Sequence, residues 1–421
     1  MLSVEEALAR VMTAATPLPD ERIPIDAAYG RVLAEPIQAP LDVPPWDNSA
    51  MDGFALKAED TGDAGASLRV VEHIPAGGWP TVPVTPGTCA RIMTGAPVPE
   101  GADAVVMIEQ TDAWEDRSAG QVGGQVQIRV AARPHQNIRD RGNDIASGSA
   151  VMAPGHSLGP AEVGILAALG LPSVRVRQRP LVALLSTGDE VVEPGWPLGD
   201  GQIHSSNTHA LAGLVIEAGG QPLNCGIASD SEEALAAGLR RCLRADLILT
   251  TGGVSVGDFD FVKDAFEGGA AGDAALDFWK VRMKPGKPLA FGTIQGRTVF
   301  GLPGNPVSCM VNFLQFVRPV MRSMLGDPTP FLPVVEAAVE GAVKKRPGRA
   351  LMERVRLRQE EGRIIASSYR NQSSGALSSM MHADGLLMLG AEAGGLEEGE
   401  IARVQVLRWG WMDGASPAYG W

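Results

Sequence analysis

Between residues 179 and 325 the sequence alternates short apolar runs with amphipathic segments, and this pattern constrains the fold most. The runs Leu-Val-Ala-Leu-Leu at 181–185 and Asp-Leu-Ile-Leu-Thr at 246–250 are typical of strands buried on both faces. The other segments are helical at 207–218, 231–244 and 306–325, and strand-like near 222–227, 278–283, 288–292 and 297–301. Such alternation predicts a mostly parallel, doubly wound α/β sheet with right-handed crossovers.

Glycine-rich or proline-rich turns follow several of these strands. They are Ser-Thr-Gly-Asp-Glu at 186–190, Thr-Gly-Gly-Val-Ser-Val-Gly-Asp at 251–258, Lys-Pro-Gly-Lys-Pro at 284–288 and Pro-Gly-Asn-Pro at 303–306. Ligands of open α/β sheets bind at the carboxyl ends of strands, and glycine lets backbone N–H groups approach a phosphate. Asn305 before Pro306 predicts a helix start that favours anions. The alternative, that glycine and proline only punctuate turns, stays open for each loop taken alone.

Basic residues gather in one short stretch of this acidic chain, at Lys280, Arg282, Lys284 and Lys287. On a single strand, side chains two residues apart point to the same side, so the first three would share one face. That face would suit phosphates or another oxyanion. The alternative is a solvated strand edge that lysines protect from pairing.

Four carboxylates, Asp52, Glu190, Asp230 and Asp260, lie in predicted loops close to these features. Carboxylate oxygens are hard ligands that suit Mg²⁺ bridging a phosphate. Asp230 with Glu233 also fits a helix-capping pair, and Asp260 could cap a helix as well. Glu190 follows a strand with no helix to cap, which favours a functional role.

The rest of the chain predicts further domains around this sheet. Residues 3–15 are expected to form an amphipathic helix with a Ser3–Glu6 capping box, and residues 160–170 a second helix. Strand patterns near 68–71, 104–108 and 126–130 lie between these helices, so a β domain is inserted in a small α/β domain. The predicted domains are 1–45 with 144–176, the insertion 46–143, the α/β domain 177–326, a β-barrel or sandwich 327–408 and a tail 409–421.

Charge and cysteine content exclude several classes of protein. The 421 residues include 36 Lys and Arg against 49 Asp and Glu, a net charge of −13, which argues against nucleic acids and anionic membranes. The four cysteines form no CxxC pair, so we expect reduced, buried thiols. The N-terminal residues lack a signal peptide's basic start, and the apolar run 163–171 is too short to span a bilayer. We therefore expect a cytoplasmic protein.

Several longer motifs resemble those of the molybdopterin molybdenumtransferases, the family of bacterial MoeA and the gephyrin E domain. The motifs are Asp-Asn-Ser-Ala-Met-Asp-Gly-Phe-Ala at 47–55, Arg-Ile-Met-Thr-Gly-Ala at 91–96, Gly-Ala-Asp-Ala-Val-Val at 101–106, the turns at 187–190, 251–257 and 284–288, Leu-Pro-Gly-Asn-Pro-Val-Ser at 302–308 and Ala-Asp-Gly-Leu-Leu at 383–387. They occur in order over residues 3–408. The resemblance implies a split N-terminal α/β domain, an inserted β domain, a molybdopterin-binding α/β domain and a C-terminal β-barrel.

The resemblance also implies a reaction and its site. Family members insert molybdenum from molybdate into adenylylated molybdopterin and release AMP, with a divalent cation, usually Mg²⁺. They are homodimers whose active site is shared between protomers, and transient contacts with molybdopterin adenylyltransferase and molybdoenzymes are expected. Carried over by position, the catalytic residues would be Asp52, Thr94, Glu190, Asp230 and Asp260, the last three also holding the metal. The pterin and anion contacts would be Thr187, Gly188, Gly252, Gly253, Ser255, Lys280, Lys284, Lys287, Pro303, Pro306, Arg354 and Ser378.

Two positions depart from the family pattern. Ser205 and Asn143 stand where many members carry a carboxylate, which affects the expected metal or pterin contacts. Two other functions remain as alternatives. One is the adenylyltransferase, which shares the Thr-Gly-Gly loop but not the motifs around Asp52 and Thr94. The other is a scaffold without catalysis, as in receptor clustering by gephyrin, which would not need the carboxylates.

Overall fold

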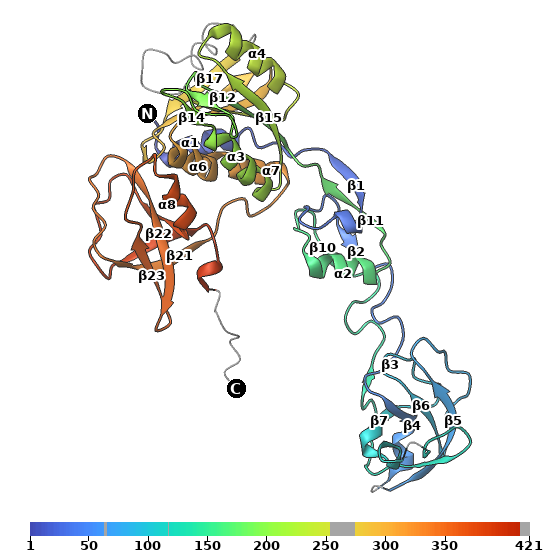
Figure 1. Ribbon diagram of the computed structural model, residues 1–421. Helices are drawn as coiled ribbons and strands as arrows, with labels where there is room; N and C mark the ends of the chain where they lie inside the picture. The colour runs from blue at the N-terminus through green and yellow to red at the C-terminus, as the bar shows by residue number, and fades with distance from the viewer. Residues whose placement is uncertain (63–64, 117, 253–273, 413–421) are drawn as a thin grey trace. The chain divides into compact units, whose positions relative to one another are not determined.

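The computed structural model describes residues 1–62, 65–116, 118–252 and 274–412, and the chain forms two compact units (Figure 1). The larger unit consists of Met1–Arg22, Gly30–Ala34 and Arg175–Trp421. The smaller unit consists of Ile23–Tyr29 and Glu35–Val174. Gly253, Ser255 and Asp260, all expected in the site, lie outside the described residues.

A six-stranded sheet forms the centre of the larger unit, in the order β15-β12-β16-β20-β19-β17. Its strands are β12 (Leu181–Thr187), β15 (Gln221–Ala228), β16 (Leu247–Thr251), β17 (Ala274–Lys280), β19 (Pro288–Ile294) and β20 (Arg297–Leu302). The four strands from β15 to β20 are parallel, whereas β19 and β17 continue the sheet antiparallel. The predicted mostly parallel α/β sheet is therefore confirmed, with an antiparallel edge that the pattern did not indicate.

Helices cover both faces of this sheet, as a doubly wound fold requires. They are α1 (Val4–Met12), α3 (Ser206–Glu217), α4 (Glu232–Cys242), α6 (Pro306–Asn312), the π-helical turn η5 (Phe313–Val317) and α7 (Arg318–Met324). Alternate residues of β12 enter opposite cores. Val182 and Leu184 belong to the core that includes α1, α3, α6 and α7, while Ala183 and Leu185 belong to the core under α4.

The structure tests two of the predicted helix caps directly. The predicted capping box at α1 is confirmed, because Glu6 N donates to Ser3 Oγ (3.1 Å) and Ser3 N donates to Glu6 Oε2 (2.7 Å). The expected Asp230 cap of α4 is wrong. Ser231 has the extended backbone of an N-cap, and its Oγ accepts from Ala234 N at 3.2 Å. The Asp230 carboxylate is thus free of that duty.

A closed five-stranded barrel follows the α/β sheet. Its order is β22-β23-β21-β25-β24, and β24 pairs again with β22. The strands are β21 (Val334–Glu340), β22 (Ala350–Glu360), β23 (Arg363–Ser368), β24 (Gly385–Leu389) and β25 (Ile401–Val406). Strand β18 (Met283–Lys284) pairs with β22, and the helices α8 (Leu377–His382) and η6 (Gly410–Met412) belong to the same part of the chain. The short parallel strands β13 (Val191–Val192) and β14 (Ile203–His204) follow β12 in the α/β domain. Of the predicted barrel or sandwich, the barrel is the form observed.

The smaller unit is built mainly from β-strands. A five-stranded sheet has the order β7-β4-β6-β5-β8, with β4 (Gly53–Leu56), β5 (Ser67–Ile74), β6 (Thr88–Ile92), β7 (Ala104–Met107) and β8 (Gln125–Gln127). Strands β1 (Asp20–Pro24) and β11 (Ser173–Arg177) pair with each other, and the division between the two units falls within both of them. Within the smaller unit, short strands pair β2 (Ile37–Gln38) with β10 (Ala150–Met152) and β3 (Asn48–Ser49) with β9 (Ile138–Arg139). Its helices are α2 (Pro160–Ala168), η1 (Ile25–Ala27), η2 (Ala58–Thr61), η3 (Ile108–Gln110) and η4 (Asp112–Trp114).

All four cysteines are free and buried, as their spacing predicted. Burial raises the pKa of the Cys89 thiol to about 12. Among the described helices, none has both the length and the apolar character needed to cross a bilayer.

Candidate active site

A cleft of about 180 Å³ lies at the carboxyl ends of the parallel strands β12 and β16. The strand register explains why three turns that are distant in sequence meet there, since Ser186 is opposite Thr251 and Thr251 is opposite Leu302. The cleft is lined by parts of the turns 186–190, 251–252 and 304–306 and by residues 203–207. Three of the four predicted loops thus converge at one edge of the sheet, where α/β folds bind ligands.

Two glycines of these loops have backbone conformations or contacts that leave no room for a side chain. Gly252 has a φ of +87°, and a Cβ there would lie 2.6 Å from the Thr187 carbonyl oxygen. Gly188 has a φ of +131°, and a Cβ there would lie 2.4 Å from Glu190 Oε2, so the Glu190 carboxylate folds back over the turn. A side chain at Gly252 would therefore push its loop away from Thr187, whereas one at Gly188 would displace the Glu190 carboxylate and strain the positive φ.

Buried hydroxyl groups form a network beneath the cleft. Ser186 Oγ shares hydrogen bonds with Thr208 Oγ1 (2.6 Å) and Thr251 Oγ1 (3.1 Å), and Ser205 Oγ shares one with Thr208 Oγ1 (3.0 Å). All four side chains are buried. The network joins the start of α3 to two strands of the sheet and gives Ser205, one of the two departures from the family pattern, a structural place. Sequence reasoning missed it, although Ser205 and Thr208, one turn apart at a helix start, are a visible signal.

Oxygen donors in and beside the cleft fit a hard divalent cation. Glu190 lines the cleft with an exposed carboxylate. Asn207 also lines it, and its amide nitrogen donates to Gly304 O (2.8 Å), while its buried Oδ1 has no hydrogen-bond partner among the described residues. A buried carbonyl oxygen without a donor is costly and is stabilised by a cation or water. Sequence reasoning did not select Asn207.

Asp230 lies beside this turn and is held by its neighbour Asp189. Asp230 N donates to Asp189 Oδ1 (3.1 Å), and Asp189 N donates to Asp230 Oδ2 (3.4 Å). These reciprocal bonds tie the loop after β15 to the loop after β12. Asp230 does not line the cleft itself, and no group of three potential metal-ligating side chains is found in the described ranges.

Arg354 on β22 is a buried cation that, among the described residues, hydrogen-bonds only to neutral groups. Its side chain is 1% exposed, and it donates from Nε to Ser379 Oγ (3.2 Å) and from Nη2 to the Ser373 carbonyl (3.1 Å). No carboxylate forms an ion pair with it within the described parts of the chain. Burial lowers the pKa of this guanidinium, as expected for a desolvated cation. An anion would compensate the charge.

The hydroxyl that holds Arg354 belongs to Ser379, the residue after Ser378, which is the predicted anion contact. Ser379 is buried on α8, whereas Ser378 is exposed. The adjoining loop contacts the α/β sheet domain, because Val307 N in α6 donates to the Ser374 carbonyl (3.0 Å). Residues 373–374 therefore connect Arg354 with α6, the helix that follows the turn containing Pro303. Pro306, the first residue of that helix, lines the cleft.

Lys280 and Lys284 belong to two different sheets and Arg282 lies between the two strands, so the expectation that the three share one strand is wrong. Strand β17 ends at Lys280, and Lys284 is in β18, which pairs with β22 of the barrel. The backbone leaves the sheet because Leu2 N donates to Lys280 O (3.1 Å) and Arg282 N donates to Leu2 O (2.8 Å). Arg282 also lies 3.6 Å from Glu392. None of Lys280, Lys284 and Lys287 lines the cleft.

The smaller unit brings Asp52 and Thr94 together, 42 residues apart in sequence. Thr94 donates from both its backbone N and its Oγ1 to Asp52 Oδ1, each at 2.7 Å. These two bonds, led by the backbone one, hold the pKa of Asp52 below its ordinary value of 3.8. The carboxylate is exposed and ionised at neutral pH, as a group that contacts a ligand requires.

Replacing Thr94 by Val is expected to raise the pKa of Asp52 part of the way towards 3.8, because one donor is lost and the backbone donor remains. Since the folded-state pKa is depressed, the contribution of Asp52 to stability is present above its unfolded pKa and is lost as the pH falls through the folded value. Carboxyl-¹³C NMR titration measures the shift. Ser118→Ala, which removes the equivalent donor to Asp116, should leave Asp52 unchanged. An unaltered Asp52 titration in Thr94→Val would contradict the assignment.

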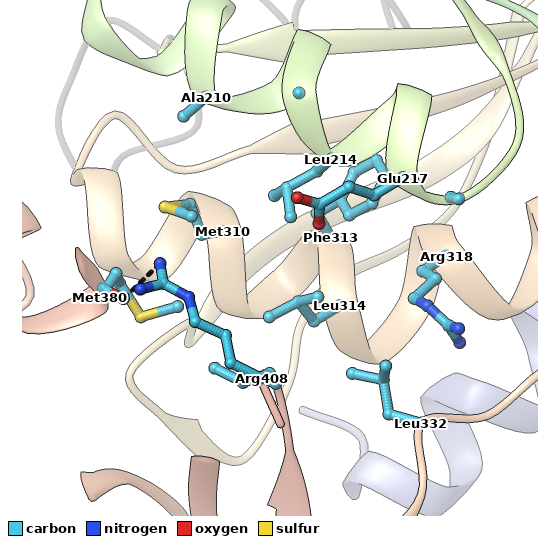
Figure 2. A pocket seen from close by; sticks show the side chains of 13 residues that line it. Ala210, Leu214, Glu217, Met310, Phe313, Leu314, Arg318, Leu332, Met380 and Arg408 are labelled. Atoms are coloured by element: carbon cyan, nitrogen blue, oxygen red, sulfur yellow. Dashed lines mark hydrogen bonds between the residues drawn. The ribbon is translucent and has the colours of Figure 1, made fainter. Parts of the chain in front are cut away.

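A second cavity of the larger unit, of about 200 Å³, is mainly apolar and does not fit this role (Figure 2). Met310, Phe313 and Leu314 line it from one helix, facing Leu214 of α3. Its arginines already have acceptors, since Arg318 donates to Pro330 O and Arg408 to Met380 O. The cleft above β12 and β16 therefore remains the candidate for a phosphorylated, metal-binding ligand.

Three family models match consecutive parts of this chain. Residues 2–170 match the MoeA N-terminal region (domain I and II), residues 183–323 a probable molybdopterin binding domain, and residues 336–407 the MoeA C-terminal region (domain IV). Molybdopterin molybdenumtransferase 2 of Mycobacterium tuberculosis is 41% identical over 399 residues, which cover 92% of this chain and 95% of the relative. The chain belongs to the molybdopterin molybdenumtransferase family.

Other members of the family agree with this assignment. The molybdopterin molybdenumtransferase of Haemophilus influenzae is 35% identical, with 96% of this chain and 98% of the relative covered. A crystal structure of the MoeA protein of Pyrococcus horikoshii superimposes with a TM-score of 0.79 at 31% identity, covering 97% of this chain and 100% of that one. The resemblance and the multidomain α/β fold expected from the motifs are thus confirmed.

Proposed function

We propose that this chain inserts molybdenum from molybdate into adenylylated molybdopterin and releases AMP during molybdenum cofactor biosynthesis. The observation that carries the proposal is the cleft at the ends of β12 and β16, where Glu190, the orphaned Asn207 oxygen and glycine-lined turns meet in a member of this family. A phosphoric anhydride needs donors for its phosphates and positioned carboxylates around its metal.

The cleft residues have complementary roles in this proposal. Thr187, Gly188 and Gly252 bring backbone groups close to the pterin phosphate, with Gly253 and Ser255 continuing the same loop in the sequence. Glu190, Asp230 and Asp260 would hold Mg²⁺, which when bound offsets the negative charge of the anhydride. Asp52 and Thr94 supply a fixed carboxylate and hydroxyl. Pro303 and Pro306 shape the turn that leads into α6.

Molybdate, the second substrate, is an anion and needs cationic contacts. Arg354 supports this role because its guanidinium is buried among neutral acceptors. Lys280, Lys284 and Lys287 add positive charge on the adjoining segment. Ser379 holds the Arg354 side chain, and the exposed hydroxyl of the neighbouring Ser378 is the proposed anion contact. Placing molybdate beside the dithiolene sulfurs is mainly a matter of orientation, and no protein nucleophile is required.

Product identity tests the proposed reaction. Purified protein is incubated with adenylylated molybdopterin, molybdate and Mg²⁺, and the product is added to an apo-molybdoenzyme. We expect the apo-enzyme to become active only when all three components were present. A folded protein whose mixture never activates the apo-enzyme would contradict the proposal and favour a scaffold role.

We also propose a homodimer in which one protomer supplies Asp52 and Thr94 and the other supplies Glu190 to each site. Mixing Asp52→Asn with Glu190→Gln protomers tests the sharing. A heterodimer then has one intact and one doubly altered site, so a fully exchanged equal mixture should recover about one quarter of wild-type activity. Sites contained within one protomer would recover none, and a fully active monomer in light scattering would also contradict the proposal.

A further inference from the structure

Asn312, the last residue of α6, is a polar side chain inside an apolar core. It is 0% exposed, and its neighbours Val311 and Phe313 belong to the core that includes α1, α3, α6 and α7. Its amide nitrogen donates to the Pro288 carbonyl (2.8 Å). The side chain thus joins α6 to the first residue of β19, where the Lys-Pro-Gly-Lys-Pro turn at 284–288 ends.

The amide oxygen of Asn312 is buried without a hydrogen-bond partner among the described residues. An unpaired acceptor in a dry core lowers stability, whereas an apolar side chain of the same outline leaves no such group. A buried polar group that breaks this rule is expected where function constrains the position. Stability alone therefore does not account for an asparagine in this core.

That oxygen lies against Gly286, in the middle of the turn. Gly286 has a φ of +102°, and a Cβ there would lie 2.5 Å from Asn312 Oδ1. The hydrogen atom in the place of this Cβ is therefore directed at the amide oxygen, as in a weak Cα–H···O contact. Asn312 thus holds the turn at two points, the glycine at its centre and the carbonyl of Pro288 at its end.

The backbone of the turn is also fixed from other sides. Lys284 pairs in parallel register with Leu351 of β22. Val281 N donates to the Lys287 carbonyl (2.9 Å), which closes the loop around the turn. The segment that carries the two lysines is therefore held by the barrel, by its own closure and by α6, and Asn312 supplies the contact with α6.

Helix α6 also leads to the cleft at the ends of β12 and β16. Pro306, its first residue, lines that cleft, and Asn312 is the last residue of the same helix. A helix of seven residues is only about 10 Å long, so its two ends move together. One short element therefore places both a wall of the cleft and the turn with Lys284 and Lys287.

We propose that Asn312 is a positioning residue, whose amide fixes the turn so that Lys284 and Lys287 present their ammonium groups to the anionic substrate. This inference rests on the proposed function, in which these lysines contact the anion. Asn312 touches no substrate and acts through the backbone of Gly286 and Pro288. Loss of the amide lets the lysines sample more positions, which weakens binding of the anion and leaves the chemical step unchanged.

Asn312→Leu tests the proposal, because leucine has a similar branched outline and neither polar group. Hydrogen exchange without substrate should be roughly tenfold faster at the amides of residues 283–287. KM for molybdate should rise about tenfold, with kcat within about twofold of the wild-type value. The melting temperature should change little, since the variant removes the orphaned oxygen but leaves the Pro288 carbonyl without its donor.

Val311→Ala is the matched structural control. Val311 is the preceding residue of α6 and is also 0% exposed. This variant should lower the melting temperature through lost packing and leave both the exchange of residues 283–287 and KM for molybdate unchanged. Equal changes of KM in Val311→Ala and Asn312→Leu would overturn the proposal, and so would wild-type exchange and KM in Asn312→Leu.

The double variant Lys284→Gln, Lys287→Gln separates this inference from the proposed function. It should raise KM for molybdate, and adding Asn312→Leu should raise KM further by much less than tenfold. A full tenfold rise on that background would contradict action through the lysines. Wild-type KM in the double variant would refute the lysine contact on which the inference rests. Wild-type exchange in Asn312→Leu beside a raised KM in the double variant would refute only the positioning role.

Discussion

Asp52→Asn is expected to reduce molybdenum insertion by about 10²- to 10³-fold while leaving the fold intact. The substitution keeps the shape of the side chain but removes the charge that Thr94 stabilises through two 2.7 Å hydrogen bonds. Asp52 is exposed, so loss of the charge leaves no buried group without a partner. Product formation under saturating molybdate and Mg²⁺ measures the effect, and circular dichroism checks the fold.

Asp116 provides a matched control for this prediction. It lies in the same unit, is exposed, and accepts from the backbone N (2.8 Å) and Oγ (2.6 Å) of Ser118, as Asp52 does from Thr94. Asp116→Asn should retain wild-type activity because nothing places it in the site. Comparable rates in both variants would show that the Asp52 charge has no special role in the reaction.

Gly53→Ala is expected to destabilise the sheet of the smaller unit by about 3 kcal/mol. Gly53 begins β4, between β6 and β7, and a Cβ there would lie 2.0 Å from the Val106 carbonyl oxygen. The backbone of β7 would have to move, and Ile108 N, which donates to Asp52 O (3.0 Å), would move with it. The close approach of these strands therefore also positions Asp52.

Hydrogen exchange resolves this effect within the multidomain chain. Amides of β4 and β7 should exchange roughly 100-fold faster in Gly53→Ala than in wild-type protein. Gly164 in α2 is the control, because it is exposed in the same unit and a Cβ there meets no atom within 4 Å. Gly164→Ala should leave β4 unchanged or slow exchange in α2, since alanine favours helix. Unchanged exchange at β4 in Gly53→Ala would contradict the packing argument.

Local sequence signals predicted much of the α/β domain. Apolar runs located β12 and β16, and the Ser3–Glu6 pair located the start of α1. These elements could be predicted because the residues that determine them are close together in the sequence. The barrel was harder to predict from the sequence. Strands such as β24 (Gly385–Leu389) were missed because their pairing partners lie elsewhere in the chain.

Parts of the site followed from sequence and parts required the structure. Motif resemblance placed Asp52 and Thr94 together, and their hydrogen bonds agree with that expectation. The hydroxyl network around Ser186, the orphaned oxygen of Asn207 and the contact of Arg354 with Ser379 arise from long-range register and helix docking. The spacing of Ser205 and Thr208 is the one local signal for the hydroxyl network, and it does not indicate which strands the hydroxyl groups meet. The basic segment was misread because backbone bonds to Leu2 end the strand early.

The most direct test of the account is AMP release from adenylylated molybdopterin, measured with and without molybdate and Mg²⁺. The account predicts release that requires both, together with a product that reconstitutes an apo-molybdoenzyme. Glu190→Gln should abolish most of this release, since Glu190 is the described carboxylate that lines the cleft. A folded wild-type protein that releases no AMP under any of these conditions would contradict it.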